Sequence, residues 1–161
     1  MNKKEDIYKI TSIVLMLDQF IKIIISHNMK LNTSITIIPD FFSIFYVKNT
    51  GAAFSILEDN TIILVLISAV FIVLLHRYIK QEKNFTKLSV ISLGMIMGGI
   101  FGNLIDRIIH HSVIDYLSFN VLEYNFPVFN LADIGITVGV GLYILSMILE
   151  RKKHKKNAND I

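Results

Sequence analysis

The sequence contains no cysteine, and charged side chains make up only 18% of its 161 residues. Without cysteine the chain has no disulfide, no thiol nucleophile and no thiolate ligand for a metal. Hydrophobic residues account for 53% of the chain, and its mean hydropathy is +0.56. This composition is too apolar for an ordinary soluble domain. The length leaves room for one domain, so we expect residues 1–161 to form a single membrane domain.

Most of the apolar residues fall in four segments, at Ile10–Ser26, Ile62–Tyr78, Leu88–Ile109 and Leu131–Leu149. A helix needs about 20 apolar residues to cross the hydrocarbon core of a bilayer. Each segment is close to that length and is apolar all round, which argues against a soluble helical bundle with one apolar stripe per helix. We therefore predict an all-α polytopic membrane protein with four transmembrane helices.

Basic residues are concentrated on one side of these segments. Twelve of the sixteen Lys and Arg precede the first segment, separate the second from the third, or follow the fourth: Lys3, Lys4, Lys9, Arg77, Lys80, Lys83, Lys87, Arg151, Lys152, Lys153, Lys155 and Lys156. The positive-inside rule then places both termini and the 77–87 loop in the cytoplasm. The net charge of +3 reflects these loops and gives no reason to expect a nucleic-acid partner. The basic tail could instead touch anionic membrane lipid.

The outer segments are then about 27–60 and 110–130. Ser34–Ile38 and Phe41–Val47 are rich in β-branched and aromatic residues, and Pro39-Asp40 between them is typical of a turn. We expect a small extracytoplasmic sheet at the membrane surface. The stretch Asn49-Thr50-Gly51-Ala52-Ala53-Phe54-Ser55 follows. Its small residues beside aromatic ones suit an extended peptide or a lipid chain resting along the surface.

Two ionisable residues interrupt the first apolar segment. Asp18 and Lys22 are four residues apart, so they share a helix face and can form an ion pair. In a structural role the pair would offset its own burial, with Lys22 extending outward along the helix. In a functional role one of them would face a site, which is the default for an ionisable group inside a span. The sequence leaves both roles open for Asp18 and favours the structural one for Lys22.

The third segment carries glycines at every fourth position, Gly94, Gly98 and Gly102, and Asp106 continues this face. Such spacing is typical of close helix packing in membranes. A carboxylate at the C-terminal end of a helix opposes the helix dipole, so Asp106 should have a positive partner. Arg107 is the nearest candidate and Lys22 is another. Gly135 and Gly139 predict a similar packing seam on the fourth segment.

Asp115 and Asp133 flank the outer loop that leads into the fourth segment. Taken alone, Asn130 and Asp133 are explained by ordinary capping of a helix start. Two carboxylates held a few ångströms apart, however, share a proton and suffice to hydrolyse a peptide, without metal or cofactor. Spacing in the sequence does not show whether any two of Asp106, Asp115 and Asp133 converge.

Five motifs in one order resemble the bacterial lipoprotein signal peptidases, also called signal peptidase II. They are Asp18-Gln19-x-x-Lys22, Asn49-x-Gly51-Ala52-Ala53-Phe54-Ser55, Gly98-Gly99-x-x-Gly102-Asn103-x-x-Asp106-Arg107, Val113-x-Asp115-Tyr116 and Pro127-x-Phe129-Asn130-x-Ala132-Asp133. The resemblance covers most of the chain and agrees with four spans. It implies an aspartyl endopeptidase, with no cofactor or metal, that removes signal peptides from prolipoproteins just before a diacylglyceryl-modified cysteine.

By matching motif, the resemblance makes Asp115 and Asp133 the catalytic pair. The supporting positions it implies are Asp18, Lys22, Asn49, Gly51, Asn103, Asp106, Arg107 and Asn130. The enzyme would be a monomer in the bacterial cytoplasmic membrane with its active site at the outer face. Because helical N–H groups favour an anion at a helix start, we expect Asp133 to be the more acidic of the pair.

Other functions remain open from the residues alone. A proton-coupled transporter would also use intramembrane carboxylates, although four helices without an internal repeat are few for alternating access. A serine peptidase could pair Ser55 with Lys22 or Lys48. Zinc chemistry is disfavoured because His110-His111 lacks metal-ligand spacing. A non-catalytic membrane subunit would keep the packing glycines without needing Asp115.

Overall fold

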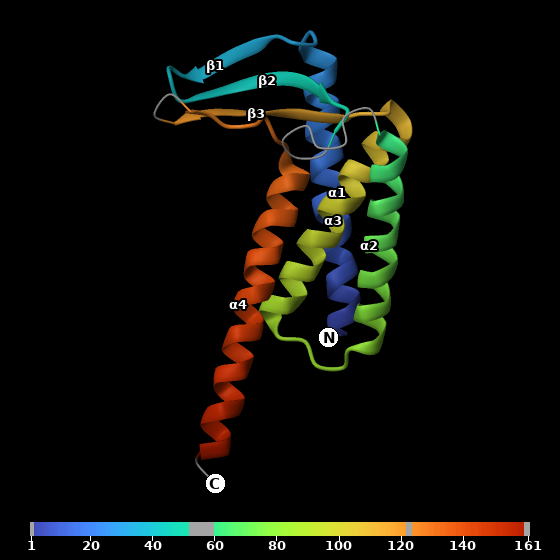
Figure 1. Cartoon of the computed structure of the whole chain (residues 1–161), viewed down its shortest axis with the longest axis vertical. Helices are drawn as coiled ribbons and strands as arrows, with labels where there is room; N and C mark the ends of the chain where they lie inside the picture. The colour runs from blue at the N-terminus through green and yellow to red at the C-terminus, as the bar shows by residue number, and fades with distance from the viewer. Residues whose placement is uncertain (1, 52–59, 122–123, 160–161) are drawn as a thin grey trace.

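The computed structural model describes residues 2–51, 60–121 and 124–159. Within them lie four helices, α1 (Lys3–Asn28), α2 (Thr61–Gln81), α3 (Lys87–His110) and α4 (Leu131–Asn159), and four strands, β1 (Ser34–Ile38), β2 (Phe42–Asn49), β3 (Val113–Val121) and β4 (Tyr124–Asn125). The helices form a bundle with the sheet lying across one end (Figure 1). Both termini and the loop between α2 and α3 lie at the opposite end.

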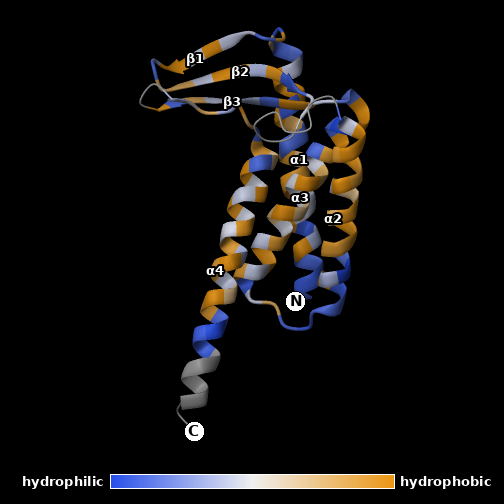
Figure 2. Ribbon diagram, in the orientation of Figure 1, coloured by the Kyte–Doolittle hydropathy of each residue, from blue (hydrophilic) through white to orange (hydrophobic). Residues whose placement is uncertain are grey.

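All four helices are long and apolar enough to cross a membrane. Their outward faces expose large apolar side chains such as Phe20, Ile62 and Leu66, as expected of helices in contact with lipid. Figure 2 shows apolar residues along the helices and hydrophilic ones at the ends away from the sheet. The prediction of four spans is confirmed, and the chain is a multi-pass membrane protein. Helix α1 begins earlier, and α4 ends later, than the apolar segments indicated.

Helix α3 is the centre of the bundle. It packs against α1, α2 and α4, and 67% of its most apolar window is buried, compared with 22% or less for the other three helices. A Cβ atom on Gly94 would stand 2.6 Å from the side chain of Ile10, and one on Gly98 would stand 2.7 Å from Val14. The predicted close packing along this face is therefore confirmed, and its partner is α1.

The glycines of α4 form the second predicted seam. A Cβ atom on Gly139 would stand 2.8 Å from the side chain of Ile96 in α3, and one on Gly135 would stand 3.2 Å from the carbonyl oxygen of Met95. On the other side of the contact, Gly99 of α3 faces the backbone carbonyl of Ala132. The first turn of α4 is therefore held directly against α3.

The sheet is antiparallel with the order β1-β2-β3-β4. The two predicted strands and the turn between them are present, and Asp40 adopts a left-handed φ of 57°, which Asp tolerates in turns. Strand β3 was not predicted, although Leu117, Phe119 and Val121 alternate with Ser118 and Asn120.

Strand β3 connects the sheet to the helices. On one side Val47 of β2 pairs with Asp115, and on the other Leu117 forms an antiparallel bridge with Phe129. The amide of Leu117 donates to the Phe129 carbonyl at 2.8 Å, and the amide of Phe129 returns a bond of 3.1 Å. This bridge brings the residues just before α4 alongside Asp115.

Candidate active site

Asp115 and Asp133 come from different elements and meet at the edge of the bundle. Asp115 lies in β3 with 2% of its surface exposed, and Asp133 lies in the first turn of α4. Asn130 joins them. Its Nδ2 donates to Oδ1 of Asp115 at 2.6 Å, and its backbone N–H donates to Oδ2 of Asp133 at 3.2 Å. Both carboxylates line one cavity, so they can act on the same bound molecule.

Asn130 and Asp133 also form the predicted capping box. The side-chain Oδ1 of Asn130 accepts from the amide of Asp133 at 3.0 Å, while the Asp133 carboxylate accepts from the amide of Asn130. This reciprocal pair satisfies two backbone donors at the helix start. The capping interpretation is thus correct, and it does not exclude a site, because Asn130 still has its Nδ2 free to bind Asp115.

Asn49 holds the other oxygen of Asp115. Its Nδ2 donates to Asp115 Oδ2 at 2.9 Å, and its Oδ1 accepts from the amide of Gly51 at 2.9 Å. The pairing of β2 with β3 brings the end of β2 to this point. Each oxygen of the Asp115 carboxylate therefore accepts from an asparagine amide, and the two bonds fix the plane of the carboxylate.

Asn103 of α3 connects Asp133 to a buried ionic cluster. Its Nδ2 donates to Asp133 Oδ1 at 2.8 Å, and its Oδ1 accepts from Lys22 Nζ at 3.0 Å and from Asn130 Nδ2 at 3.1 Å. Asn103 thus touches the Asp133 carboxylate, the Asn130 bridge and the nearest ammonium group. It sets the orientation of Asn130 as well as that of Asp133.

Lys22 is the cation of this cluster. Its Nζ lies 2.8 Å from Asp18 Oδ2 and 2.9 Å from Asp106 Oδ2, and only 1% of the residue is exposed. The predicted ion pair of Asp18 with Lys22 is present, but the expectation that Lys22 extends outward is wrong. A buried ammonium needs full pairing, and the two carboxylates with Asn103 supply three acceptors for its three N–H groups.

Asp106 takes Lys22, and not the adjacent Arg107, as its partner. Neighbouring residues on a helix point about 100° apart, so Asp106 faces α1 while Arg107 turns toward the outer segment. Asp106 Oδ2 also accepts from the amide of Ile114 at 3.1 Å, which ties the start of β3 to the end of α3. Arg107 Nη2 donates to the carbonyl of Gly51 at 3.1 Å.

Arg107 lines the cavity beside Asp133 and Asp115, and the negative charges of these two residues act on it more strongly than that of Asp106. Among the residues that the structure describes, its Nε is buried without a hydrogen-bond partner. The rest of the motif that begins at Asn49, Ala52–Ser55, lies outside the described residues, and so does the candidate nucleophile Ser55.

The cavity has a volume of about 660 Å³ and two unlike walls. Its polar wall consists of Asn49, Asn103, Arg107, Asp115 and Asp133. Its apolar wall consists of Val113, Phe126, Pro127, Val128, Phe129, Ile134, Ile136 and Val138. The arrangement fits a substrate that combines a peptide group with a long apolar part.

The surroundings of Asp115 raise its pKa from 3.8 to about 7. Burial is the largest cause and the negative charge of Asp133 is the second. The hydrogen bonds from Asn49 and Asn130, and the charge of Lys22, oppose this rise. Because the first two effects disfavour the ionised form, Asp115 retains its proton to a much higher pH than an ordinary aspartate does.

Two further polar residues of the site were given no role from the sequence. Gln19 Nε2 donates to Asp106 Oδ1 at 2.9 Å and to the carbonyl of Gly102 at 3.1 Å, and the hydroxyl of Tyr116 accepts from the amide of Leu131 at 3.2 Å. Asp18 similarly accepts from the amide of Ala132 at 2.9 Å. Gln19 and Tyr116 each follow an acidic residue in the quoted motifs, and this position is the sequence feature that could have indicated a role for them.

Between residues 2 and 159, outside the gaps 52–59 and 122–123, no group of His, Asp or Glu is placed to hold a metal ion.

The fold and the paired carboxylates define the class of this chain, a multi-pass membrane protein with an acidic site of the kind that aspartic peptidases use. The model of the family "Signal peptidase (SPase) II" matches residues 10–149. A lipoprotein signal peptidase of Symbiobacterium thermophilum is 41% identical over 141 residues, covering 88% of this chain and 93% of that protein. The chain therefore belongs to the signal peptidase II family, the lipoprotein signal peptidases, which cleave signal peptides from prolipoproteins.

Solved structures agree with this assignment. A bacterial membrane enzyme determined by the in meso method at 2.3 Å resolution superposes with a TM-score of 0.82 at 30% identity, covering 89% of this chain and 88% of that one. A second bacterial membrane enzyme, at 1.9 Å resolution, gives a TM-score of 0.77 at 31% identity, with 86% and 89% coverage. The four-helix arrangement with an outer sheet is thus shared over most of the chain.

Proposed function

We propose that Asp115 and Asp133 are the catalytic pair of this peptidase, and that it cuts on the N-terminal side of the diacylglyceryl-modified cysteine. The observation that carries the assignment is the bridge through Asn130, which joins the only two carboxylates that line the cavity, as far as the structure describes it. Asp18 and Asp106 are excluded from chemistry because Lys22 and backbone amides occupy them.

The roles follow from the environment of each carboxylate. Asp115, with its pKa raised to about 7, is the acid and gives its proton to the carbonyl oxygen of the scissile amide. Asp133 is the base and removes a proton from the attacking water, whose oxygen bonds to the carbonyl carbon. In the resulting tetrahedral intermediate Asp133 gives its proton to the departing nitrogen, and Asp115 recovers one from a hydroxyl as the C–N bond breaks. Both aspartates return to their starting protonation states.

The remaining polar residues position this pair. Asn49 and Asn130 orient Asp115, while Asn103 orients Asp133. Arg107 lies at the same wall, and its contact with the Gly51 carbonyl ties the outer segment to α3. Asp18 accepts from the amide of Ala132 at the start of α4, and Lys22 holds Asp18 in place by an ion pair.

The substrate would lie across the two walls of the cavity. The scissile peptide would face the aspartates, and the diacylglyceryl group would lie against the apolar wall and the adjoining membrane lipid. All the polar residues of the site come from one chain, which suits a monomer. The basic residues at the opposite end support our proposal that both termini lie in the cytoplasm and that the site faces the outer side of the bacterial cytoplasmic membrane.

Cleavage of a defined substrate tests the assignment. The purified protein is given a diacylglyceryl-modified prolipoprotein, and the shortened product is measured for the wild type, Asp115→Asn and Asp133→Asn. We expect both variants to lose cleavage by at least about a thousandfold, as expected when a proton-transfer group is removed. Asp40→Asn, an exposed acid in the β1–β2 turn, is the matched control and should cleave normally. Undiminished cleavage by either active-site variant would remove that residue from the chemistry.

A further inference from the structure

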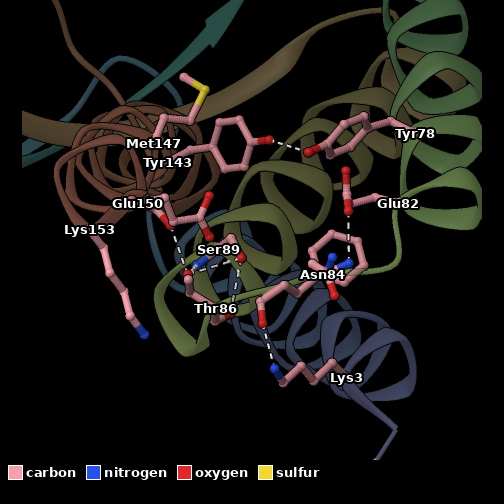
Figure 3. A pocket seen from close by; sticks show the side chains of 12 residues that line it. Lys3, Tyr78, Glu82, Asn84, Thr86, Ser89, Tyr143, Met147, Glu150 and Lys153 are labelled. Atoms are coloured by element: carbon pink, nitrogen blue, oxygen red, sulfur yellow. Dashed lines mark hydrogen bonds between the residues drawn. The ribbon is translucent and has the colours of Figure 1, made fainter. Parts of the chain in front are cut away.

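A second cavity, which we call the distal cavity, lies at the end of the bundle away from the sheet. It has a volume of about 560 Å³ and lies between the ends of α2 and α4 and the beginning of α3. Figure 3 shows Tyr78 and Tyr143 meeting across one side of it, from α2 and α4. Their hydroxyl groups are 2.5 Å apart. The catalytic mechanism makes no use of this cavity.

The charges deepest in the distal cavity are negative. Glu82 and Glu150 are half-buried, whereas the two lysines that line it, Lys3 and Lys153, are exposed. Lys3 Nζ is bound to the carbonyl of Phe85 at 2.6 Å, and the side chain of Lys153 points away from the tyrosine pair in Figure 3. The cavity therefore presents carboxylates inside and ammonium groups at its rim.

Partly buried carboxylates need hydrogen-bond donors, and the carboxylates of Glu82 and Glu150 can accept further hydrogen bonds. Glu82 accepts from the amides of Lys83 and Asn84 at 2.8 and 2.7 Å, and both bonds go to its Oε1. No salt bridge joins Glu82 or Glu150 to a cation within the described residues. Such groups favour a ligand that brings positively charged N–H donors.

The distal cavity lies on the same helix faces as the catalytic cavity. Ser89 of the distal cavity and Arg107 of the catalytic one are separated by about five turns of α3, so they project from one side of it. On α4, Ile136 of the catalytic cavity shares a face with Tyr143 and Glu150 of the distal one, at intervals of about two turns. One elongated substrate lying along α3 and α4 would reach both cavities.

The distance between the cavities also suits such a substrate. From Asp133 to Glu150 helix α4 rises about 25 Å, which a helical peptide of about 17 residues would span. A signal peptide has about 15–30 residues, with an apolar stretch in the middle and positively charged residues near its N-terminus. If its cleavage site lies at the aspartates, its charged end lies at the other end of the bundle.

We propose that the distal cavity binds the positively charged N-terminal region of the signal peptide, with Glu82 and Glu150 as the groups that recognise its ammonium or guanidinium side chains. This rests on the proposed function, because it assumes that the peptide bond is cut beside Asp115 and Asp133. It assigns this peptidase a specificity site about 25 Å from its chemistry along α4.

The test compares two substrates that differ only in this charge. Both are diacylglyceryl-modified prolipoproteins with the same apolar stretch, one with lysines in its N-terminal region and one with glutamines instead. They are cleaved in vesicles of zwitterionic lipid, so that general attraction of cations to the membrane is absent. The wild type should prefer the cationic substrate by roughly tenfold in kcat/KM, through a lower KM, as expected for charge-assisted hydrogen bonds.

In the double variant Glu82→Gln with Glu150→Gln this preference should fall to about one. Glutamine keeps the acceptor oxygen that Glu82 uses for the loop amides, and thermal unfolding checks that the variant is folded. Glu5→Gln, an exposed acid in the first turn of α1, is the control and should keep the preference. Replacing Glu82 and Glu150 by lysine should reverse the preference, toward a substrate with an acidic N-terminal region.

Three results would overturn the proposal. Equal cleavage of the two substrates by the wild type, or an unchanged preference in the double variant, would show that the distal cavity does not read this charge. An equal change in cleavage of both substrates that depends on the vesicle lipid would assign the cavity to a lipid headgroup instead. Failure of the catalytic assignment is separate, because it appears as cleavage by Asp115→Asn on either substrate.

Discussion

Asn130 donates its side-chain amide to Asp115 at 2.6 Å, while its side-chain oxygen Oδ1 accepts from the amide of Asp133 and so caps α4. One residue thereby begins a membrane helix and holds a carboxylate of the neighbouring strand. The arrangement couples the geometry of the acidic pair to the start of the helix that carries Asp133.

The two tasks of Asn130 can be separated by Asn130→Ser. Serine is a good N-cap, so the change in capping alone should cost no more than about 1 kcal/mol of stability. Its hydroxyl is too short to reach Asp115 as the amide does, so kcat should fall by at least about tenfold. Asn130→Ala should lose both the cap and the bridge. Cleavage assays and thermal unfolding of the two variants check this, and full activity in Asn130→Ser would show that the bridge is dispensable.

Replacing Lys22 by methionine should destabilise the fold. It leaves Asp18 and Asp106 buried without a cation, at a cost of about 3–5 kcal/mol. Lys9→Met, at an exposed pair with Asp6 on the same helix, is the control and should cost less than about 1 kcal/mol. Unfolding followed in detergent micelles measures both. Similar losses in the two variants would contradict the view that the Lys22 cluster braces the site.

The pH dependence should follow the proton on Asp115. If Asp115 must be protonated to act as the acid, kcat/KM falls as the pH rises through about 7. The negative charge of Asp133 is one cause of the raised pKa of Asp115, so Asp133→Asn should move this titration to lower pH. Infrared spectroscopy of the protonated carboxyl group measures this titration independently of catalysis, and Asp40→Asn is the control. No shift in Asp133→Asn would indicate that the two carboxylates are not coupled.

The same shift has a consequence for stability. Because folding raises the pKa of Asp115, the folded state binds its proton more tightly than the unfolded state does. The contribution of Asp115 to stability is therefore fully present below about pH 4, and it is lost as the pH rises toward about 7.

Close packing of α3 on α4 predicts different effects for two glycines. In Gly99→Ala the new methyl group would meet the backbone carbonyl of Ala132, which cannot move without shifting the first turn of α4. Both stability and cleavage should fall, the former by about 1–3 kcal/mol as in overpacked cores. A Cβ atom on Gly141 meets nothing within 4 Å, so Gly141→Ala should be neutral or stabilising by up to about 1 kcal/mol. Normal activity in Gly99→Ala would mean that α4 can shift without disturbing Asp133.

The sequence by itself determined the membrane architecture. Helix length, the position of charges and the spacing of glycines are local properties, and each predicts a span, an orientation or a packing face without knowledge of the rest of the chain. The β1–β2 hairpin could be predicted for the same reason, from Pro39-Asp40 between two β-rich runs. The ordered motifs added the family and its acidic residues.

Only the tertiary structure decided which polar residues meet. Asp106 takes Lys22, 84 positions away along the chain, in preference to the adjacent Arg107, because α1 and α3 pack through glycines that allow close approach. Asp115 meets Asn130 because β3 bridges to Phe129, and β3 itself was missed. Contacts of this kind depend on how separate elements pack. Local sequence patterns identify the polar residues of the site, and the packing between elements determines which of them are in contact.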